Sequence, residues 1–311
     1  MSAVTTTTVS SAGAAAEDKA QRPRIRQPKK SGSGAQPSTY ARVLGVTLAV
    51  VALVYFLAPV WWLIVSSTKS NTGMITHPGF WFAEDSLGAN YSSLMAWTQG
   101  LFWRWVGNSL FYSTTAGVAG TLLSVMAGYS LAKFSFPGKK LVLALVMSGL
   151  LLPIALLTVP LYLEFHALGL VNTVWAIIIP SMVSPFGVFL GMVYANSSVP
   201  TELIEAARID GAGEARIFFT MVLRLLAPPM VTIFLFIFVA TWNNFLLPLL
   251  MISSPELKPV TLGLYGMMSY FSPDKGAVML GALMGVIPLV ILFFALQRYW
   301  RSGLAAGSVK G

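Results

Sequence analysis

The sequence predicts an all-α, polytopic membrane protein with six transmembrane helices and both termini in the cytoplasm. Its composition is the first reason: 56% of the 311 residues are hydrophobic and 10% are charged, whereas a soluble domain has about 25% charged residues. The second is a set of six uncharged apolar runs, each near or above the roughly 20 residues that a helix needs to cross a bilayer. The third is an uneven distribution of Lys and Arg between alternate loops, which sets the orientation.

The N-terminal segment, residues 1–39, is rich in Ser, Thr, Ala, Gly, Pro and basic residues, with almost no large apolar side chains. Such a segment cannot bury enough apolar surface to offset the entropy lost on ordering, so we expect a disordered basic tail in the cytoplasm. A membrane domain, residues 40–311, follows. Its first apolar run is longer than the core of a signal peptide and is expected to be an uncleaved anchor.

The six predicted spans contain no Asp, Glu, Lys, Arg or His. This agrees with the cost of about 2.5–3.5 kcal/mol for most such charges at the centre of a membrane helix. The spans cover approximately residues 43–65, 106–132, 141–163, 171–194, 228–252 and 277–296.

Loop charges orient these spans. With the N-terminus inside, the cytoplasmic segments carry sixteen of the 20 Lys and Arg residues, which predicts an N-in, C-in topology. The same pattern accounts for the net charge of +9 through membrane topology and attraction to anionic lipid headgroups, and we expect no nucleic-acid partner.

Small residues and prolines suggest how the spans pack. Small side chains four residues apart let helix backbones approach closely, and prolines inside the runs tend to kink them. The small-residue series are Ala116, Gly120, Ser124 and Gly128 in the second run, and Ala277, Gly281 and Gly285 in the sixth.

The outer loop, residues 66–105, is rich in aromatic residues. They favour an aromatic belt and an interfacial helix at the headgroups, with a docking surface for an extracytoplasmic partner as the alternative. The aromatic residues are Trp81, Phe82, Trp97, Phe102 and Trp103.

Several kinds of chemistry are not expected. The chain has no cysteine, and its two histidines, His77 and His166, have no neighbours at ligand spacing, so no metal or cofactor site is predicted. An ion-coupled secondary transporter usually needs an ionisable residue within a span. An intramembrane enzyme would need a catalytic cluster at that depth. Neither feature is present in the six runs.

A charged island separates the fourth and fifth runs, and the topology places it in the cytoplasm. Glu202 and Glu205 lie near the positive end of a predicted helix dipole. Ala206 and Ala207 leave room for the surface of another protein, and Asp210-Gly211 is a natural helix stop. A surface helical hairpin with no partner is the alternative interpretation.

The segment "ELIEAARIDGAGEARIFFTMVLRLLAPP" resembles the EAA loop of the membrane subunits of binding-protein-dependent ABC importers. We call residues 200–224 the EAA loop. The pattern E-A-A-x-x-x-G is matched throughout, whereas Met221 and Arg224 replace the usual Ile and Pro at the end of the loop. Three other segments are similar to the maltose-type, carbohydrate-uptake branch: "WVGNSLFYSTTAGVAGTLLSVMAGYSLAKFSFPGKK", "TWNNFLLPL" and "LQRYWRSGLAAGSVKG".

The resemblance implies the membrane domain of a type I ABC importer in a bacterial or archaeal inner membrane. Its partners would be a second permease subunit, a dimer of ATP-binding subunits and an extracytoplasmic sugar-binding protein. The chain has no G-x-x-x-x-G-K-S/T phosphate loop, so ATP and Mg²⁺ would be bound, and ATP hydrolysed, by the partner ATPase. An importer for a non-sugar solute is the first alternative, and an ion-coupled secondary transporter is the second.

The resemblance also implies two groups of residues at the ATPase. The coupling residues would be Glu205, Ala206, Ala207, Asp210 and Gly211. Residues 298–311 would form a cytoplasmic tail reaching the ATPase interface through Gly303, Gly307 and Lys310.

One polar group inside a span is a candidate for the substrate pathway. Asn243 and Asn244 follow Trp242 in the fifth run. Amides offer hydrogen-bond donors and acceptors, and an indole offers a flat face, so together they suit a sugar. Hydrogen bonding between helices is an equally weighted alternative, and adjacent residues point to different faces.

Overall fold

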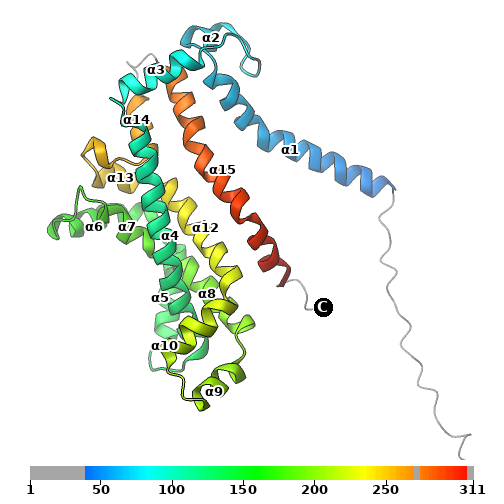
Figure 1. Cartoon of the computed structure of the whole chain (residues 1–311), viewed down its shortest axis with the longest axis vertical. Coiled ribbons are helices and arrows are strands. Elements are labelled where there is room, and N and C mark those ends of the chain that lie inside the picture. The colour runs from blue at the N-terminus through cyan, green and yellow to red at the C-terminus, as the bar shows by residue number, and fades with distance from the viewer. Residues whose placement is uncertain (1–38, 269–273, 307–311) are drawn as a thin grey trace, which may run out of the picture. The chain divides into compact units, whose positions relative to one another are not determined.

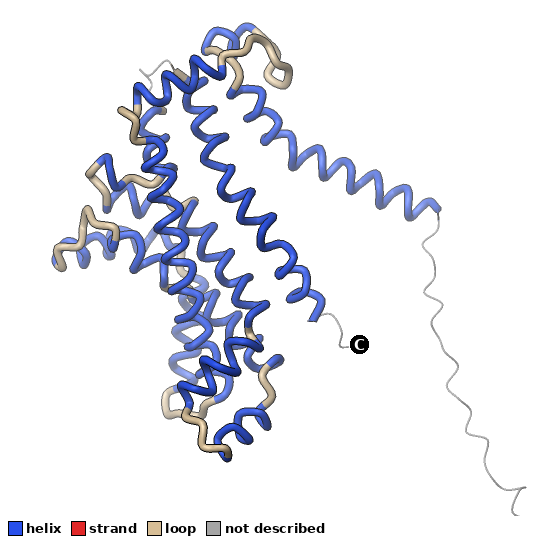
Figure 2. The backbone as a smooth tube through the Cα atoms, in the orientation of Figure 1, coloured by secondary structure: helices blue, strands red, loops and turns tan. Residues whose placement is uncertain are grey.

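A computed structural model describes residues 39–268 and 274–306, and all regular structure within these ranges is helical (Figures 1 and 2). The elements run in chain order as α1 (Thr39–Ser67), α2 (Asn71–Thr76), α3 (Leu87–Trp97), α4 (Phe102–Lys133), α5 (Lys139–Leu151), α6 (Ile154–Ala167), α7 (Trp175–Met182), α8 (Pro185–Ser198), α9 (Thr201–Ile209), α10 (Glu214–Ile217), the π-helix η1 (Phe218–Val222), α11 (Leu223–Leu225), α12 (Ala227–Trp242), α13 (Leu246–Met251), the 3₁₀ helix η2 (Pro255–Leu257), α14 (Val260–Met267) and α15 (Lys275–Ala306).

The chain divides into two units at Phe56. The described part of the first unit is the beginning of α1, whose side chains there are exposed and mostly apolar. The second unit holds the remaining helices and the sites discussed below. Apart from Thr39, which begins α1, the predicted N-terminal tail lies outside the described residues.

Four described helical segments are long and apolar enough to cross a membrane: α1, α4, α7 with α8, and α15. Two bent pairs raise this number to as many as six if each pair counts as one span. The predicted all-α, polytopic fold is therefore confirmed.

The predicted span at residues 141–163 is two helices, α5 and α6, bent by 108°. The bend falls at Leu152 and Pro153. A residue before proline is forced towards extended backbone, and Leu152 has φ −76° and ψ 123°. Proline also removes an amide donor, so the helix stops and restarts.

The predicted span at residues 228–252 is also interrupted, between α12 and α13. A continuous helix would need the amide of residue 248 to bond the carbonyl of Asn244, and Pro248 has no amide hydrogen. The freed Asn244 carbonyl accepts a 3.1 Å hydrogen bond from Thr261 Oγ1. The Asn244 side chain accepts a 3.4 Å bond from the Leu247 amide in the new helix.

Helix α4 lies at the centre of the packing. It contributes buried side chains to three apolar clusters, for example Tyr129 to one, Phe102 to the second and Tyr112 to the third. Its most extensive neighbours are α8 and α12. These neighbours connect α4 to the segments on both sides of the EAA loop.

The predicted small-residue series on α4 lies where this helix packs against α7 and α8. A Cβ on Gly128 would lie 2.5 Å from the Met192 backbone nitrogen and 2.8 Å from the Val188 carbonyl oxygen. A Cβ on Gly120 would lie 2.8 Å from the Met182 carbonyl oxygen. Only glycine permits helix backbones to approach this closely.

The aromatic outer loop contains α2 and α3, and its residues divide in two. Trp81 and Trp103 are exposed, whereas Phe102 is fully buried in the core. Phe102 therefore belongs to the packing of α4 against α3 and α15.

Candidate functional site

The charged island folds into a short helix, a turn and a second helical segment. Helix α9 precedes the turn, and α10, η1 and α11 follow it. Figure 1 shows α9 and α10 near one end of α4, with α3 near the other. The EAA loop is thus attached to the cytoplasmic end predicted for α4.

Helix α9 divides its side chains between the core and the surface. Ile204 and Ala207 are buried in the apolar cluster that contains Tyr129 of α4. Glu205 and Ala206 are exposed. The structure therefore separates the two predicted alanines, because Ala207 packs against the chain's own core and Ala206 faces outward.

The turn after α9 has the hydrogen bonds of a Schellman motif. The Ala212 amide donates to the Ala207 carbonyl at 2.9 Å, and the Gly211 amide donates to the Arg208 carbonyl at 3.0 Å. This motif needs a left-handed residue at its centre, usually glycine. Gly211 has φ +79°. Its left-handed backbone explains why a glycine stands at this predicted coupling position.

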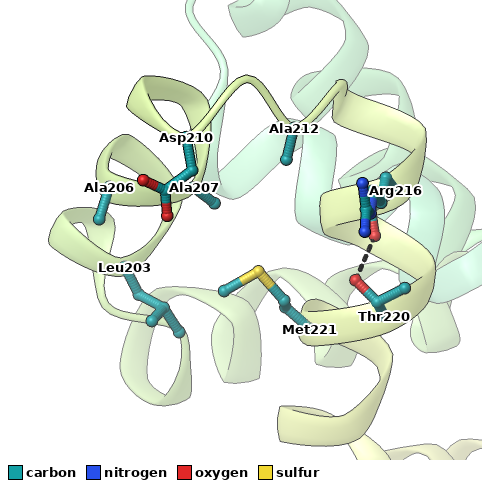
Figure 3. A pocket seen from close by; sticks show the side chains of 8 residues that line it. All are labelled: Leu203, Ala206, Ala207, Asp210, Ala212, Arg216, Thr220 and Met221. Atoms are coloured by element: carbon teal, nitrogen blue, oxygen red, sulfur yellow. Dashed lines mark hydrogen bonds between the residues drawn. The ribbon is translucent and has the colours of Figure 1, made fainter.

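The EAA loop has two arms, α9 before the turn and α10, η1 and α11 after it. A groove with a cavity of about 320 Å³ lies between these two arms (Figure 3). Asp210 stands on the α9 side, and Arg216 stands on the other arm, where its carbonyl accepts a 2.6 Å hydrogen bond from Thr220 Oγ1. The groove therefore offers both charge signs beside an apolar floor. Its lining is Leu203, Ala206, Ala207, Asp210, Ala212, Arg216, Thr220 and Met221.

An ion pair closes the turn between the arms. Arg208 Nε donates to Glu214 Oε1 at 2.6 Å, with both side chains nearly half exposed. The hydrogen bond to the Glu214 carboxylate raises the pKa of Arg208 above its ordinary value. Each charge also suits its helix end, because Arg208 is in the last turn of α9 and Glu214 in the first turn of α10.

The end of the EAA loop contains the two departures from the family pattern. Met221 falls in the π-helix η1, and the segment from Glu214 to Leu225 meets α12 at an angle of 83°. Pro228 follows the bend and lacks the amide that would bond the Arg224 carbonyl. A bend therefore occurs here without the proline that usually ends the loop.

The predicted tail residues lie partly beyond the described structure. Helix α15 extends to Ala306, so the predicted tail, residues 298–311, begins as a continuation of the last span. Gly303 lies in this helix. Gly307 and Lys310 lie outside the described residues.

The three predicted pathway residues do not form one surface. Trp242 is buried and stacks on Phe238 with ring centroids 5.8 Å apart, so it is a core residue. The Asn244 side chain accepts the 3.4 Å hydrogen bond from the Leu247 amide of α13. Asn243 is exposed, and its side chain donates to the Val239 carbonyl of its own helix at 3.0 Å. Within the described residues, neither asparagine side chain makes the predicted alternative, a hydrogen bond to another membrane helix.

Ile209 is a surface residue that the sequence interpretation missed. It is 87% exposed at the end of α9, next to the turn. Its position offered a signal, because it lies off the face defined by Ile204 and Ala207, yet it is apolar within a charged island.

Comparisons with known proteins agree with this architecture. A family model described as "Binding-protein-dependent transport system inner membrane component" matches residues 120–305. The arabinooligosaccharides transport system permease protein AraQ of Halalkalibacterium halodurans is 38% identical over 212 residues, covering 68% of this chain and 76% of that protein. The lactose transport system permease protein LacG of Rhizobium radiobacter is 33% identical over 270 residues, covering 85% and 96%.

A solved structure has the same fold. It is a chain of a bacterial ABC transporter involved in the import of the acidic polysaccharide alginate, with a TM-score of 0.72 and 21% sequence identity. The match covers 85% of this chain and 98% of that chain. It therefore extends over nearly all of that chain.

Proposed function

Because this chain belongs to the family of binding-protein-dependent transport system inner membrane components, we propose that it forms half of the translocation pathway of an ATP-driven carbohydrate importer. A second permease subunit would form the other half. An extracytoplasmic binding protein would deliver the sugar, and a dimer of ATP-binding subunits would hold ATP and Mg²⁺. The permease proteins AraQ and LacG, which match this chain, are named for oligosaccharide and disaccharide transport, which supports a carbohydrate as the solute.

The EAA loop is the observation on which the coupling proposal depends. Its helix α9 is fixed to the core by Ile204 and Ala207 while Glu205, Ala206 and Ile209 remain exposed. A partner that grips the exposed side therefore moves a helix that is anchored inside the membrane domain. The Gly211 turn and the groove give this helix a defined surface to present.

The topology supports placing this surface in the cytoplasm. An N-in orientation assigns sixteen of the 20 Lys and Arg residues to cytoplasmic segments, including those of the EAA loop. Both termini would then lie on the cytoplasmic side, where the tail residues Gly303, Gly307 and Lys310 would reach the ATPase. ATP hydrolysis by a partner on that side would drive the pathway from its cytoplasmic end.

A growth screen tests the substrate class. A strain that lacks this gene should lose growth on, and uptake of, one or more di- or oligosaccharides, and expression of the chain should restore both. Unchanged growth on all saccharides, together with lost uptake of another solute class such as peptides, would refute the carbohydrate assignment.

Charge reversal at Glu205 tests the coupling surface. Glu205→Lys should abolish uptake of the saccharide identified by the screen while the chain remains in the membrane. Glu202→Lys is the matched control, because Glu202 is also exposed on α9 but lies one turn earlier. Normal uptake and normal saccharide-stimulated ATP hydrolysis in Glu205→Lys would contradict the proposal.

A further inference from the structure

Arg208 has a second partner besides Glu214. The centre of its guanidinium group lies 5.7 Å from the centroid of the Phe134 ring, within the distance at which a cation is attracted to an aromatic face. Phe134 caps the C-terminal end of α4. One side chain of the EAA loop therefore contacts both the start of α10 and the end of the second membrane span.

Aromatic contacts extend this connection into the core. The Phe134 ring meets the Tyr129 ring edge-on with centroids 5.6 Å apart, and Tyr129 lies 5.7 Å from Phe218 of η1. Tyr129 is 3% exposed, and its hydroxyl has no hydrogen-bond partner within the described structure. Tyr129 is therefore held in place by ring packing, and its contact with Phe218 joins α4 to the second arm of the EAA loop.

Another polar contact between α4 and α9 is weaker. Lys133 Nζ reaches Thr201 Oγ1 at 3.5 Å, which is longer than an ordinary hydrogen bond. Lys139 Nζ donates to the Phe134 carbonyl at 3.0 Å and so holds the backbone that carries the Phe134 ring. Arg208 is thus the polar group of α9 best placed to act on the end of α4.

Helix α4 is well suited to pass on a displacement. Its backbone lies against that of α8 at Gly128, with no room for a Cβ, and it contributes to all three apolar clusters. Closely packed interiors transmit strain because they cannot be compressed. A shift at Phe134 would therefore move more of the membrane domain than a shift at a loosely packed end.

We propose that Arg208 and Phe134 are positioning residues that tie the EAA loop to the second span, so that motion of α9 is delivered to α4. This inference rests on the proposed function and adds to it a route within the membrane domain. The ion pair with Glu214 holds the guanidinium across the turn, and the flat guanidinium covers the Phe134 ring. Lysine carries the same charge but lacks this planar group.

The test uses the complete transporter in proteoliposomes and measures saccharide uptake per ATP hydrolysed. Arg208→Lys keeps the charge, and Phe134→Leu keeps an apolar side chain while removing the ring. In both variants uptake per ATP should fall by about 2- to 30-fold, the range produced by residues along a coupling network. The ATPase subunits should still co-purify in wild-type amounts, which a merely unfolded loop would not allow.

A charge exchange separates the two contacts of Arg208. The double variant Arg208→Glu with Glu214→Arg can restore the ion pair across the turn, but it removes the cation from Phe134. Uptake per ATP should remain low in this variant, although thermal stability returns towards that of wild type. Recovery of both quantities would show that only the ion pair matters and would overturn the proposal.

Two outcomes distinguish failure of this inference from failure of the proposed function. If the wild-type complex shows no ATP-driven saccharide uptake, the proposed function fails. If the wild-type complex is driven by ATP but Phe134→Leu and the charge exchange both retain the wild-type uptake per ATP, the function stands and the route through Arg208 and Phe134 is refuted.

Discussion

Replacement of Gly211 tests whether the backbone of the EAA loop or the small size of its side chains determines coupling. Gly211 has φ +79°, and among the described residues, its two chain neighbours aside, no atom lies within 4 Å of an added Cβ. The cost of a side chain within this chain is therefore conformational. A left-handed backbone costs a non-glycine residue about 1–2 kcal/mol, which shifts the balance between this turn and its alternatives by about 5- to 30-fold.

Three variants of Gly211 separate the effect of backbone conformation from the effect of side-chain size. Asparagine tolerates left-handed backbone better than alanine, and a β-branched residue tolerates it least. Uptake and saccharide-stimulated ATP hydrolysis should therefore fall in the order Gly211→Asn, Gly211→Ala, Gly211→Val. Gly213→Ser is the matched control, because Gly213 has φ −71° and an added Cβ would have open space among the described, non-neighbouring residues. Serine is favoured at an N-cap, the place that Gly213 takes in α10, so this variant should behave like wild type.

The assay compares the reconstituted complexes at equal amounts of chain and ATPase subunit. If Gly211→Asn is more damaging than Gly211→Ala, side-chain size at the partner's surface decides, and the backbone argument is refuted. If Gly211→Val has wild-type activity, the left-handed turn is unnecessary for coupling.

Three further predictions concern packing, the pathway and pH. Gly128→Ala should destabilise the purified chain by about 1–3 kcal/mol, the usual cost of overpacking, because its Cβ would meet the backbone of α8. Gly107 is on the same helix, and a Cβ added there would have open space among the described residues. Gly107→Ala should therefore not lower the temperature at which half of the chain is unfolded. Asn243→Ala should change saccharide selectivity with little change in stability. Asn244→Ala should lower stability by about 0.5 kcal/mol, because its side chain would no longer accept the hydrogen bond from the Leu247 amide; the reverse result would remove Asn243 from the pathway. Hydrogen bonds from the Ser70 side chain and amide lower the pKa of Glu84, so their stabilisation is present above the ordinary glutamate pKa and is lost as the pH falls through the lowered value. Between about pH 5 and about pH 3, wild type should therefore lose more thermal stability than Glu84→Gln. Equal losses in the two proteins would contradict the predicted direction of the pH dependence.

The spans were predictable because membrane insertion depends on local composition, whereas the breaks within them were not. Pro160 and Pro288 lie inside helices, yet helices end at Pro153 and shortly before Pro248. At the break before Pro248, the freed Asn244 carbonyl accepts a hydrogen bond from Thr261. A contact across 17 residues is not visible in the proline pattern.

The EAA loop was predictable as a helix, a glycine stop and a second helix, but not in the direction of its side chains. Rotation of α9 is set by burial of Ile204 and Ala207 in the core, which places Ala207 inward and Ile209 outward. The role of Arg208 depends on Phe134, 74 positions earlier in the chain. Trp242 was assigned to the pathway from its polar neighbours, and its ring instead packs on Phe238.

Labelling of single cysteines gives the most direct test of the claim that an ATPase grips the EAA loop from the cytoplasm. The chain has no cysteine of its own, so Ile209→Cys and Ile75→Cys can each be labelled alone; the two isoleucines are 87% and 81% exposed, on α9 and on the predicted outer helix α2. With a membrane-impermeant maleimide, Ile209→Cys should react only in inverted vesicles and should be protected when the ATPase subunit is present, whereas Ile75→Cys should react only in right-side-out vesicles. Reaction of Ile209→Cys in right-side-out vesicles, or no protection by the ATPase subunit, would contradict the account.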